Sequence, residues 1–364
     1  PLTAELTGWS PFVPGSADDS SLPVAALEYA LTNPTDEALE AVFSFHVPAS
    51  MAGPLRAGGR FVTARVRDGF VVEHLPPDGM EGNHGWLGVS TDHLDARVHC
   101  QWFRGGWFDT PTMLWNLVAS GAAPEADPYA EGADTPGSSI FVPLTLTPGQ
   151  TKTVRIRICW YVPQSELNTV APDQEYNKEE CCGGGCDCAP GTNGYKPWYS
   201  RRFRDIQEGM RHFGREYDAL RKSTTAFTAC FYSSTLPPEV LEAVSANLAI
   251  LKSPTVLREA GGKLWGWEGC NDDAGCCSGS CTHVWNYAQA IPHLFPELER
   301  SLREVEFLQS QDRKGHQNFR AALPLRDYRH TFHAAADGQL GGVMKAWRDW
   351  RVSGDTPWLK GLWP

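Results

Sequence analysis

Hydrophobic residues recur with one period in the first half of the chain and with another in the second half. In residues 151–161, Val154, Ile156 and Ile158 alternate with polar or charged residues, which is the period of a strand with one solvated face. In residues 236–251 the apolar positions follow helical spacing instead, and no βαβ alternation occurs anywhere. The sequence therefore predicts an antiparallel β domain followed by an α domain. The predicted buried face of the first α-domain helix comprises Val240, Val244, Leu248 and Leu251.

Turn signals divide the first half of the chain into short strands. Residues 24–45 form two apolar stretches around the turn signal Asn33-Pro34-Thr35-Asp36. Residues 138–162 repeat this pattern around Pro148-Gly149. Because short strands punctuated by Gly and Pro are typical of two-sheet folds, we expect an antiparallel β-sandwich.

Residues 166–198 are polar, rich in glycine and cysteine, and follow neither period, so they predict a loop. The domains that we expect are residues 1–198 for the sandwich with this loop, 199–235 for a connecting helix and linker, and 236–364 for the α domain. Further helices are predicted over 283–309 and 338–353. One stripe of the last helix carries Leu340, Val343, Met344 and Trp347.

Composition excludes several functional classes. A net charge of −11 with scattered Lys and Arg argues against a nucleic-acid partner. No apolar run approaches the ~18 residues of a membrane span, and no phosphate-binding glycine motif supports a nucleotide cofactor. Fourteen Trp residues are more than a soluble enzyme usually carries, and such rings stack on sugars, although most should lie in the core. Because the chain starts at Pro1 without a signal-peptide pattern and its last stretch, GDTPWLKGLWP, breaks off without a tail, we expect a piece of a longer polypeptide. The expected location is cytoplasmic, and a signal sequence lost from the fragment is the alternative.

Two clusters share the pattern Cys-Cys-x-x-x-Cys and leave several chemistries open. Four thiolates could bind a structural zinc ion, but neither cluster has the paired Cys-x-x-Cys spacing of a zinc ribbon. Disulfides and unpaired packing cysteines are the alternatives, and Cys281 with His283 is a further candidate as a nucleophilic pair. The clusters are Cys181, Cys182, Cys186 with Cys188, and Cys276, Cys277, Cys281 with Cys270.

Glycoside hydrolysis requires two carboxyl groups that flank the scissile bond. The carboxylates that lie near aromatics in loop-like stretches are Glu268, Asp272, Asp273 and Asp337. Two structural roles compete with catalysis: Glu268 could hold its loop by hydrogen bonds, and Asp337 could cap a helix that begins near Gly338.

Three stretches resemble glycoside hydrolase family 116, which includes the non-lysosomal glucosylceramidases. They are GWSPFVPGSADDSSLPVAALEYALTNPTDE, LWGWEGCNDDAGCCSGSCTHVWNYAQAIPHLFPELERSLREVEF and HAAADGQLGGVMKAWRDWRVSGDTPWLKGLWP. The resemblance covers nearly all of the chain. It implies an N-terminal β-sandwich followed by an (α/α)6 barrel, of which only the first helices would be present, and a start of the sandwich that is missing before Pro1.

The resemblance also implies a function. The family hydrolyses β-glucosides with retention of configuration, and the aglycone is a lipid or a second sugar. The glutamate nucleophile and the aspartate acid/base would both lie beyond residue 364, and no cofactor is implied. In this segment the expected sugar-pocket residues are His283, Trp285, Asn286 and Asp337, with the indole stacking and the polar groups binding hydroxyls. The alternative is a non-catalytic glycan-binding or scaffold module.

Overall fold

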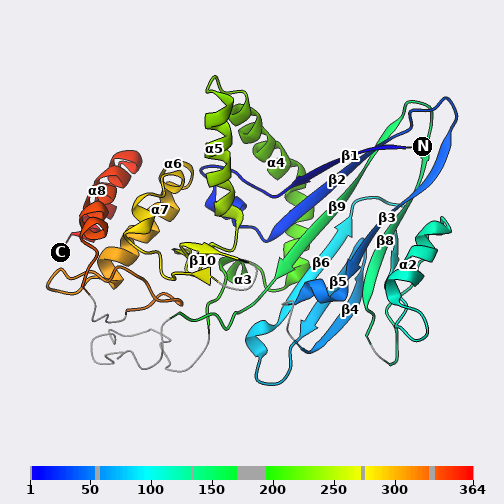
Figure 1. Ribbon diagram of the computed structural model, residues 1–364, viewed down its shortest axis with the longest axis horizontal. Helices are drawn as coiled ribbons and strands as arrows, with labels where there is room; N and C mark the ends of the chain where they lie inside the picture. Colours follow the sequence, from blue (N-terminus) through cyan, green and yellow to red (C-terminus); the bar gives the residue numbers. More distant parts are fainter. Residues whose placement is uncertain are drawn as a thin grey trace. The chain divides into compact units, whose positions relative to one another are not determined.

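The computed structural model describes residues 2–53, 58–132, 134–169, 194–271, 275–327 and 333–363. Its contacts divide the chain into two compact units, which differ from the expected linear division because each contains three segments (Figure 1). The first unit comprises Pro1–Pro11, Leu22–Pro163 and Arg202–Arg221, and the second comprises Phe12–Ser21, Gln164–Arg201 and Lys222–Pro364.

Two antiparallel sheets form the first unit. The larger has the strand order β1-β2-β9-β6-β5-β4, and the smaller has the order β3-β8-β7. Strands of the larger sheet are β1 (Thr3–Trp9), β2 (Val24–Thr32), β4 (Arg60–Val66), β5 (Gly69–Leu75), β6 (Gly85–Thr91) and β9 (Thr151–Tyr161). Those of the smaller sheet are β3 (Leu39–Pro48), β7 (Arg97–His99) and β8 (Gly137–Leu146). Its short helices are η1 (Ala49–Ala52), η2 (Glu81–Asn83) and α2 (Thr110–Ala119).

The strands predicted around the two turn signals are present, but neither turn closes a hairpin. The first turn joins β2 to β3 and the second joins β8 to β9, so both connect strands of different sheets. Asn33 ties the two turns together, because its side-chain amide donates to the carbonyls of Glu37 (2.7 Å) and Leu146 (3.0 Å). Its Oδ1 accepts a hydrogen bond from the backbone of Thr35, which forms an Asx turn.

Both sheets contribute to one apolar core. Phe70, Val89 and Ile156 enter it from the larger sheet, and Ile140 and Val142 enter it from the smaller one. Each such side chain contributes about 1.5–3 kcal/mol when it is fully buried. Antiparallel sheets followed by helices confirm the coarse fold expectation, while the (α/α)6 barrel stays a prediction.

The first part of α4 (Ile206–Tyr232) packs on the larger sheet (Figure 1). A Cβ on Gly88 would lie 2.4 Å from Sδ of Met210, so the helix approaches β6 where the strand has no side chain. Glu28 of β2 accepts hydrogen bonds from Tyr217 (2.8 Å) and Arg221 (3.1 Å) of α4 and from Trp9 (3.2 Å) of β1. This carboxylate therefore joins the sheet to the helix.

Glu28→Gln is expected to destabilise the protein at neutral pH and to have little effect in acid. Burial raises the pKa of Glu28, but hydrogen bonds from Arg221 and Tyr217 outweigh it, and the net pKa lies below the usual 4.5. Because the folded-state pKa is depressed, the ionised contacts stabilise the fold above about pH 4.5, and this stabilisation is lost as the pH falls through the folded-state pKa. Urea unfolding should show a loss of about 1–2 kcal/mol at pH 7 that shrinks as the pH falls through the folded-state pKa of Glu28. An equal loss at pH 7 and in acid would contradict this account.

The second unit consists of short helices and small two-stranded sheets. Its strands pair as β10 (Val256–Arg258) with β11 (Leu264–Gly266) and as β12 (Gly269–Cys270) with β13 (Gly275–Cys276). Its helices are α1 (Ala17–Ser20), α3 (Trp198–Arg202, whose last residue falls in the first unit), the end of α4, α5 (Pro238–Ala249), η3 (Ile250–Lys252), η4 (Val284–Asn286), α6 (Ala290–Leu294), α7 (Pro296–Glu304), η5 (Val305–Gln309), α8 (Ala336–Ser353) and α9 (Thr356–Leu362). None of the described helices combines the length and apolarity needed to cross a membrane.

Two helix predictions for this unit were wrong in detail. The single helix predicted over 283–309 is broken into η4, α6, α7 and η5, and Pro296 starts α7 where its missing N–H costs nothing. The predicted core face is only partly packed. Val240 and Val244 are about 40% exposed and Leu241 is the buried residue of α5, whereas Leu251 of η3 packs against a core cluster.

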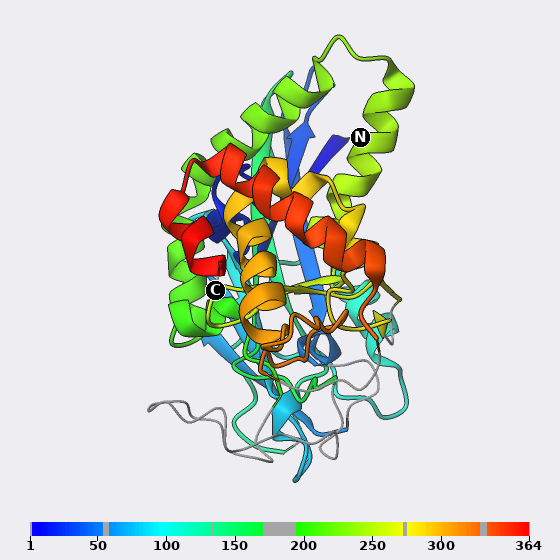
Figure 2. The ribbon, with the colours of Figure 1, turned by 90° about the vertical axis from the view of Figure 1, so that its left-hand side faces the viewer.

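Charged residues are buried between α7, η5 and α8, which lie side by side (Figure 2). Arg303 is fully buried and contacts Glu306 at 2.5 Å and Glu299 at 3.9 Å. Lys345 of α8 lies 3.7 Å from Glu306, and Arg348 donates to Glu299 at 2.7 Å. We call Glu299, Arg303, Glu306, Lys345 and Arg348 the buried ionic cluster.

One face of α8 is apolar and exposed. Its members are separated by three or four positions, which places them on one side of the helix. They are Leu340, Val343, Met344 and Trp347, with exposed fractions of 70%, 58%, 72% and 59%. Soluble monomers rarely leave a contiguous apolar stripe of this kind uncovered.

Candidate functional site

A cavity of about 590 Å³ lies within the second unit, and this volume is typical of small-molecule sites. Aromatic side chains from separate segments line it, and Val244 and Leu248 of α5 and Leu251 of η3, all from the predicted helix face, contribute to its wall. The aromatic lining residues are Phe227, Phe231, Trp267, Trp285 and Tyr287. The polar ones are Asn247, Glu268, Gln289 and His293, so Glu268 is the one carboxylate among the described lining residues.

Hydrogen bonds hold both the side chain and the backbone of Glu268, although it lines a cavity. Its Oε1 accepts a hydrogen bond from Arg320 at 2.9 Å, and Arg320 also donates to the carbonyl of Ser278 at 2.7 Å. Its backbone N–H donates to the carbonyls of Cys276 (3.1 Å) and Cys277 (3.2 Å). The loop-holding role expected for Glu268 is therefore present, and the same contacts orient its carboxylate.

The residues around Glu268 are shaped to admit aromatic rings. Trp265 is fully buried, and its ring meets the ring of Trp267 edge-on at 4.9 Å. A Cβ on Gly266 would lie 2.3 Å from the indole of Trp285. Glycine at this position therefore lets β11 and the Trp285 ring pack together at the cavity wall.

His283, Asn286 and Asp337, three of the four predicted sugar-pocket residues, lie together. Nδ1 of His283 is 2.5 Å from Oδ2 of Asp337, and the side-chain amide of Asn286 donates to the backbone carbonyl of Asp337 at 2.8 Å. The hydrogen bond from His283 lowers the pKa of Asp337. Both the imidazole and the carboxylate remain about half exposed, so they can still meet a ligand.

Glycines of α8 make this contact possible. A Cβ on Gly338 would lie 2.4 Å from Oγ1 of Thr282, and one on Gly341 would lie 2.1 Å from Nδ2 of Asn286. The predicted capping role of Asp337 was wrong, because α8 begins at Ala336 and its N-cap is Ala335. Asp337 lies in the first turn, where its Oδ1 accepts a hydrogen bond from the N–H of Gly338 at 2.9 Å.

Trp285, the fourth predicted residue, occupies a different position. Its ring is only 8% exposed and packs in a core cluster with Leu264, Ile291 and Phe295. It forms part of the cavity wall, and its Nε1 has no hydrogen-bond partner in the described part of the chain. A ligand acceptor that reached this N–H would satisfy it.

Two aromatic residues of the site were missed by sequence reasoning. Tyr287 is 70% exposed, lines the cavity and meets the His283 ring edge-on at 6.0 Å. Trp267 lines the cavity beside Glu268. The signal that could have found both is their position next to the chosen residues, Trp267 before Glu268 and Tyr287 after Asn286.

The structure describes the second of the two cysteine clusters. Cys181, Cys182, Cys186 and Cys188, like Asp272 and Asp273, lie outside the described residues. Within the described ranges no three His, Cys, Asp or Glu side chains are placed to hold one metal ion, and Cys270, Cys276, Cys277 and Cys281 are free thiols. Cys281 is buried, and the described contacts of His283 run to Asp337 and Tyr287 rather than to this thiol.

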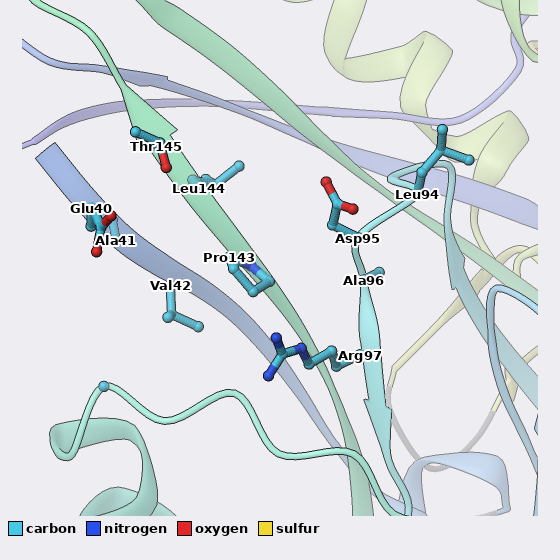
Figure 3. A pocket seen from close by; sticks show the side chains of 11 residues that line it. Glu40, Ala41, Val42, Leu94, Asp95, Ala96, Arg97, Pro143, Leu144 and Thr145 are labelled. Atoms are coloured by element: carbon cyan, nitrogen blue, oxygen red, sulfur yellow. The ribbon is translucent and has the colours of Figure 1, made fainter. Parts of the chain in front are cut away.

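A second, more open groove of about 760 Å³ lies in the first unit, on the face of the smaller sheet (Figure 3). Arg97 of β7 points across this face toward Pro143 of β8 and Val42 of β3. Glu40 and Asp95 supply carboxylates, so the groove carries both signs of charge. It contains no aromatic lining residue among those described and is a weaker candidate for chemistry.

Comparisons with known proteins bear on the identity of the chain. The model of the N-terminal domain of "beta-glucosidase 2, glycosyl-hydrolase family 116" matches residues 1–220, more than half of the 364 residues. A solved structure of a putative kojibiose phosphorylase from human microbiome aligns with a TM-score of 0.43 and 11% identity. The alignment covers 98% of this chain and 40% of that one, so this chain spans less than half the length of that protein. No curated protein is significantly similar to the sequence. The match over residues 1–220 confirms the predicted resemblance: the chain belongs to glycoside hydrolase family 116.

Proposed function

We propose that this chain is part of a retaining β-glucosidase of the glucosylceramidase type and that the cavity of the second unit belongs to its substrate site. The family match over residues 1–220 is the observation that carries this proposal. The cavity supports it, because it combines aromatic walls with one oriented carboxylate, which is one of the two carboxyl groups that a glycosidase site requires.

The proposed roles follow from side-chain chemistry and exposure. His283, Asn286 and Asp337 are not among the residues that line the cavity, but Tyr287, which does line it, meets the His283 ring edge-on. His283, Asn286 and Asp337 bind sugar hydroxyls, since imidazole, amide and carboxylate offer both donors and acceptors. Trp285 contributes its unpaired N–H and one wall rather than an exposed stacking face. The aglycone, a lipid or a second sugar, lies along the apolar side formed by Phe227, Phe231 and α5.

We further propose that Glu268 is the nucleophile. The resemblance implied that both catalytic carboxylates follow residue 364, but Glu268 already lies in the cavity wall, where Arg320 orients its carboxylate. In a retaining mechanism, Glu268 would attack the anomeric carbon while an acid protonates the leaving oxygen, and water would then release glucose. We assign the acid/base aspartate to none of the described residues.

The (α/α)6 barrel is also a proposal. The exposed stripe of α8, formed by Leu340, Val343, Met344 and Trp347, supports it, because further hairpins of the barrel would cover this face. In this proposal the described helices of the second unit are the first of the barrel.

Assay of the full-length gene product with an aryl β-glucoside tests the function. Proton NMR of the first product should show the β-anomer of glucose, since double displacement retains configuration. Early release of the α-anomer would refute retention. No turnover by a folded protein that still binds sugar would refute the hydrolase and favour the second candidate below.

The second candidate is a non-catalytic glycan-binding module, and the groove of Figure 3 is the observation that favours it. Arg97, Glu40 and Asp95 offer hydrogen-bonding groups on one sheet face without a catalytic environment. In that case Arg97→Ala would abolish oligosaccharide binding measured by calorimetry, whereas Glu268→Gln would leave it unchanged. The hydrolase proposal expects Arg97→Ala to leave oligosaccharide binding unchanged, because Arg97 does not line the cavity of the second unit.

A further inference from the structure

Cys276 and Cys277 form a pair of neighbouring thiols at the surface of the second unit. Both side chains are exposed, and their Sγ atoms are 3.2 Å apart. Cys277 has a positive φ of 55°, a left-handed conformation that is uncommon for residues other than glycine. Cys277 follows directly after β13, and with this backbone conformation its thiol lies beside that of Cys276.

The pair is directly connected to Glu268. The backbone N–H of Glu268 donates to the carbonyls of both cysteines, at 3.1 and 3.2 Å. Arg320 bonds the carbonyl of Ser278, the next residue, and the carboxylate of Glu268. Any change in the peptide between Cys276 and Cys277 therefore reaches the backbone and the side chain of Glu268.

The strand that carries the pair also touches the cavity wall. A Cβ on Gly275 would lie 2.2 Å from the Trp267 ring, so β13 rests on an indole that lines the cavity. A shift of this strand cannot occur without a shift of that ring, because packed interiors have few voids.

From this geometry we propose that Cys276 and Cys277 are a reversible oxidation site, which closes to a disulfide between adjacent residues and displaces Glu268. A disulfide needs the sulfurs about 2.05 Å apart, roughly 1 Å closer than the thiols now lie. Consecutive Cα atoms are ~3.8 Å apart, below the usual range for bridged cysteines, so the ring is strained and easily reduced. Strained, exposed disulfides serve in regulation rather than in structure.

The oxidant is a low-molecular-weight disulfide such as oxidised glutathione. The thiolate of one cysteine attacks it, forms a mixed disulfide and releases one glutathione thiolate. The thiolate of the second cysteine then attacks the protein sulfur of this mixed disulfide, forms the bond between Cys276 and Cys277, and releases the other glutathione as a thiolate. One S–S bond is broken and one is formed, two electrons pass from the protein to glutathione, and the two thiol protons end on the released thiols.

Mass spectrometry of the full-length protein treated with oxidised glutathione tests the closure. The wild-type peptide with both cysteines should lose two hydrogens, carry no glutathione and resist alkylation until dithiothreitol is added. The matched variants Cys276→Ser and Cys277→Ser should each keep one glutathione adduct on the remaining thiol. A persistent adduct on the wild type, free alkylation, or bridging to Cys270 or Cys281 would overturn the proposal.

The displacement of Glu268 has its own measurement, which does not depend on catalysis. Hydrogen exchange of the Glu268 amide should accelerate at least tenfold on oxidation of the wild type and stay constant in both serine variants. Unchanged exchange in the closed form would overturn the coupling. The effect of this displacement on activity rests on the proposed function. If Glu268 acts in that function, oxidation should lower the turnover of an aryl β-glucoside, and dithiothreitol should restore it. Absence of any turnover in reduced protein would instead count against the proposed function.

Discussion

Glu268→Gln should lower kcat/KM for an aryl β-glucoside by about 10⁴-fold or more in the full-length protein, the order of loss expected when a nucleophile is removed. The amide keeps the size of the carboxylate but cannot attack the anomeric carbon. Substrate affinity should change little, because Gln can retain the hydrogen bond from Arg320. The measurement is steady-state kinetics on the variant and the wild type.

Two further experiments make this expectation specific. In Glu268→Ala, added azide should restore turnover and yield the α-glucosyl azide, because a small anion can occupy the vacated space. A 2-deoxy-2-fluoro-glucoside should label the peptide that contains Glu268 in the wild type.

Glu242→Gln, on an exposed surface of α5 away from the lining residues, is the matched control and should keep full activity. Labelling of a carboxylate beyond residue 364, with an active Glu268→Gln, would return the nucleophile to the position first implied by the resemblance.

Arg303→Met should reduce the free energy of unfolding by about 3–5 kcal/mol, the usual result of removing one partner from a buried ion pair. Arg303 is fully buried, and its loss leaves Glu299 and Glu306 without their central cation. Burial already raises the pKa of Glu306, so this carboxyl would become still harder to keep ionised. Urea unfolding followed by tryptophan fluorescence measures the loss.

The same helix provides the control for this prediction. Arg300 lies one turn earlier and pairs with Asp355 at 2.9 Å, but both side chains are partly exposed. Arg300→Met should cost less than about 1 kcal/mol, as exposed ion pairs do. The double variant Arg303→Met, Glu306→Leu should recover part of the loss, because it no longer buries the Glu306 charge. Equal losses for Arg303→Met and Arg300→Met would show that the buried ionic cluster contributes no more than a surface pair.

Local patterns predicted the strands well and their partners poorly. The turn at Asn33 and the alternation in residues 151–161 both marked real strands. Alternation indicates which face of a strand is exposed to solvent, but not which strand pairs with it. The sequence therefore did not predict that each turn connects strands of different sheets. The predicted helix over 283–309 failed for a local reason, since Pro296 can start a helix but interrupts one that is already running.

In the candidate site, too, the sequence marked individual residues better than it marked their neighbours. The resemblance pointed to both His283 and Asp337, which are 54 residues apart in the sequence, and no spacing rule predicts the hydrogen bond between them. Helical periodicity predicted that Val240 and Val244 share one face of their helix and would be buried. It does not show what that face packs against, and both residues are about 40% exposed. The clustering of Cys276 and Cys277 was visible, but their approach to 3.2 Å depends on a left-handed backbone that composition does not reveal.

Gly338 and Gly341 allow a close approach of α8 to its neighbours. Because neither residue has a side chain, the backbone at the start of this helix lies directly against Thr282 and Asn286. A single added methyl at either position would act as a spacer and draw the Asp337 carboxylate away from the imidazole of His283. The alignment of this hydrogen-bonded pair is thus set by bare backbone, and alanine at either position would lengthen the distance between Nδ1 of His283 and Oδ2 of Asp337.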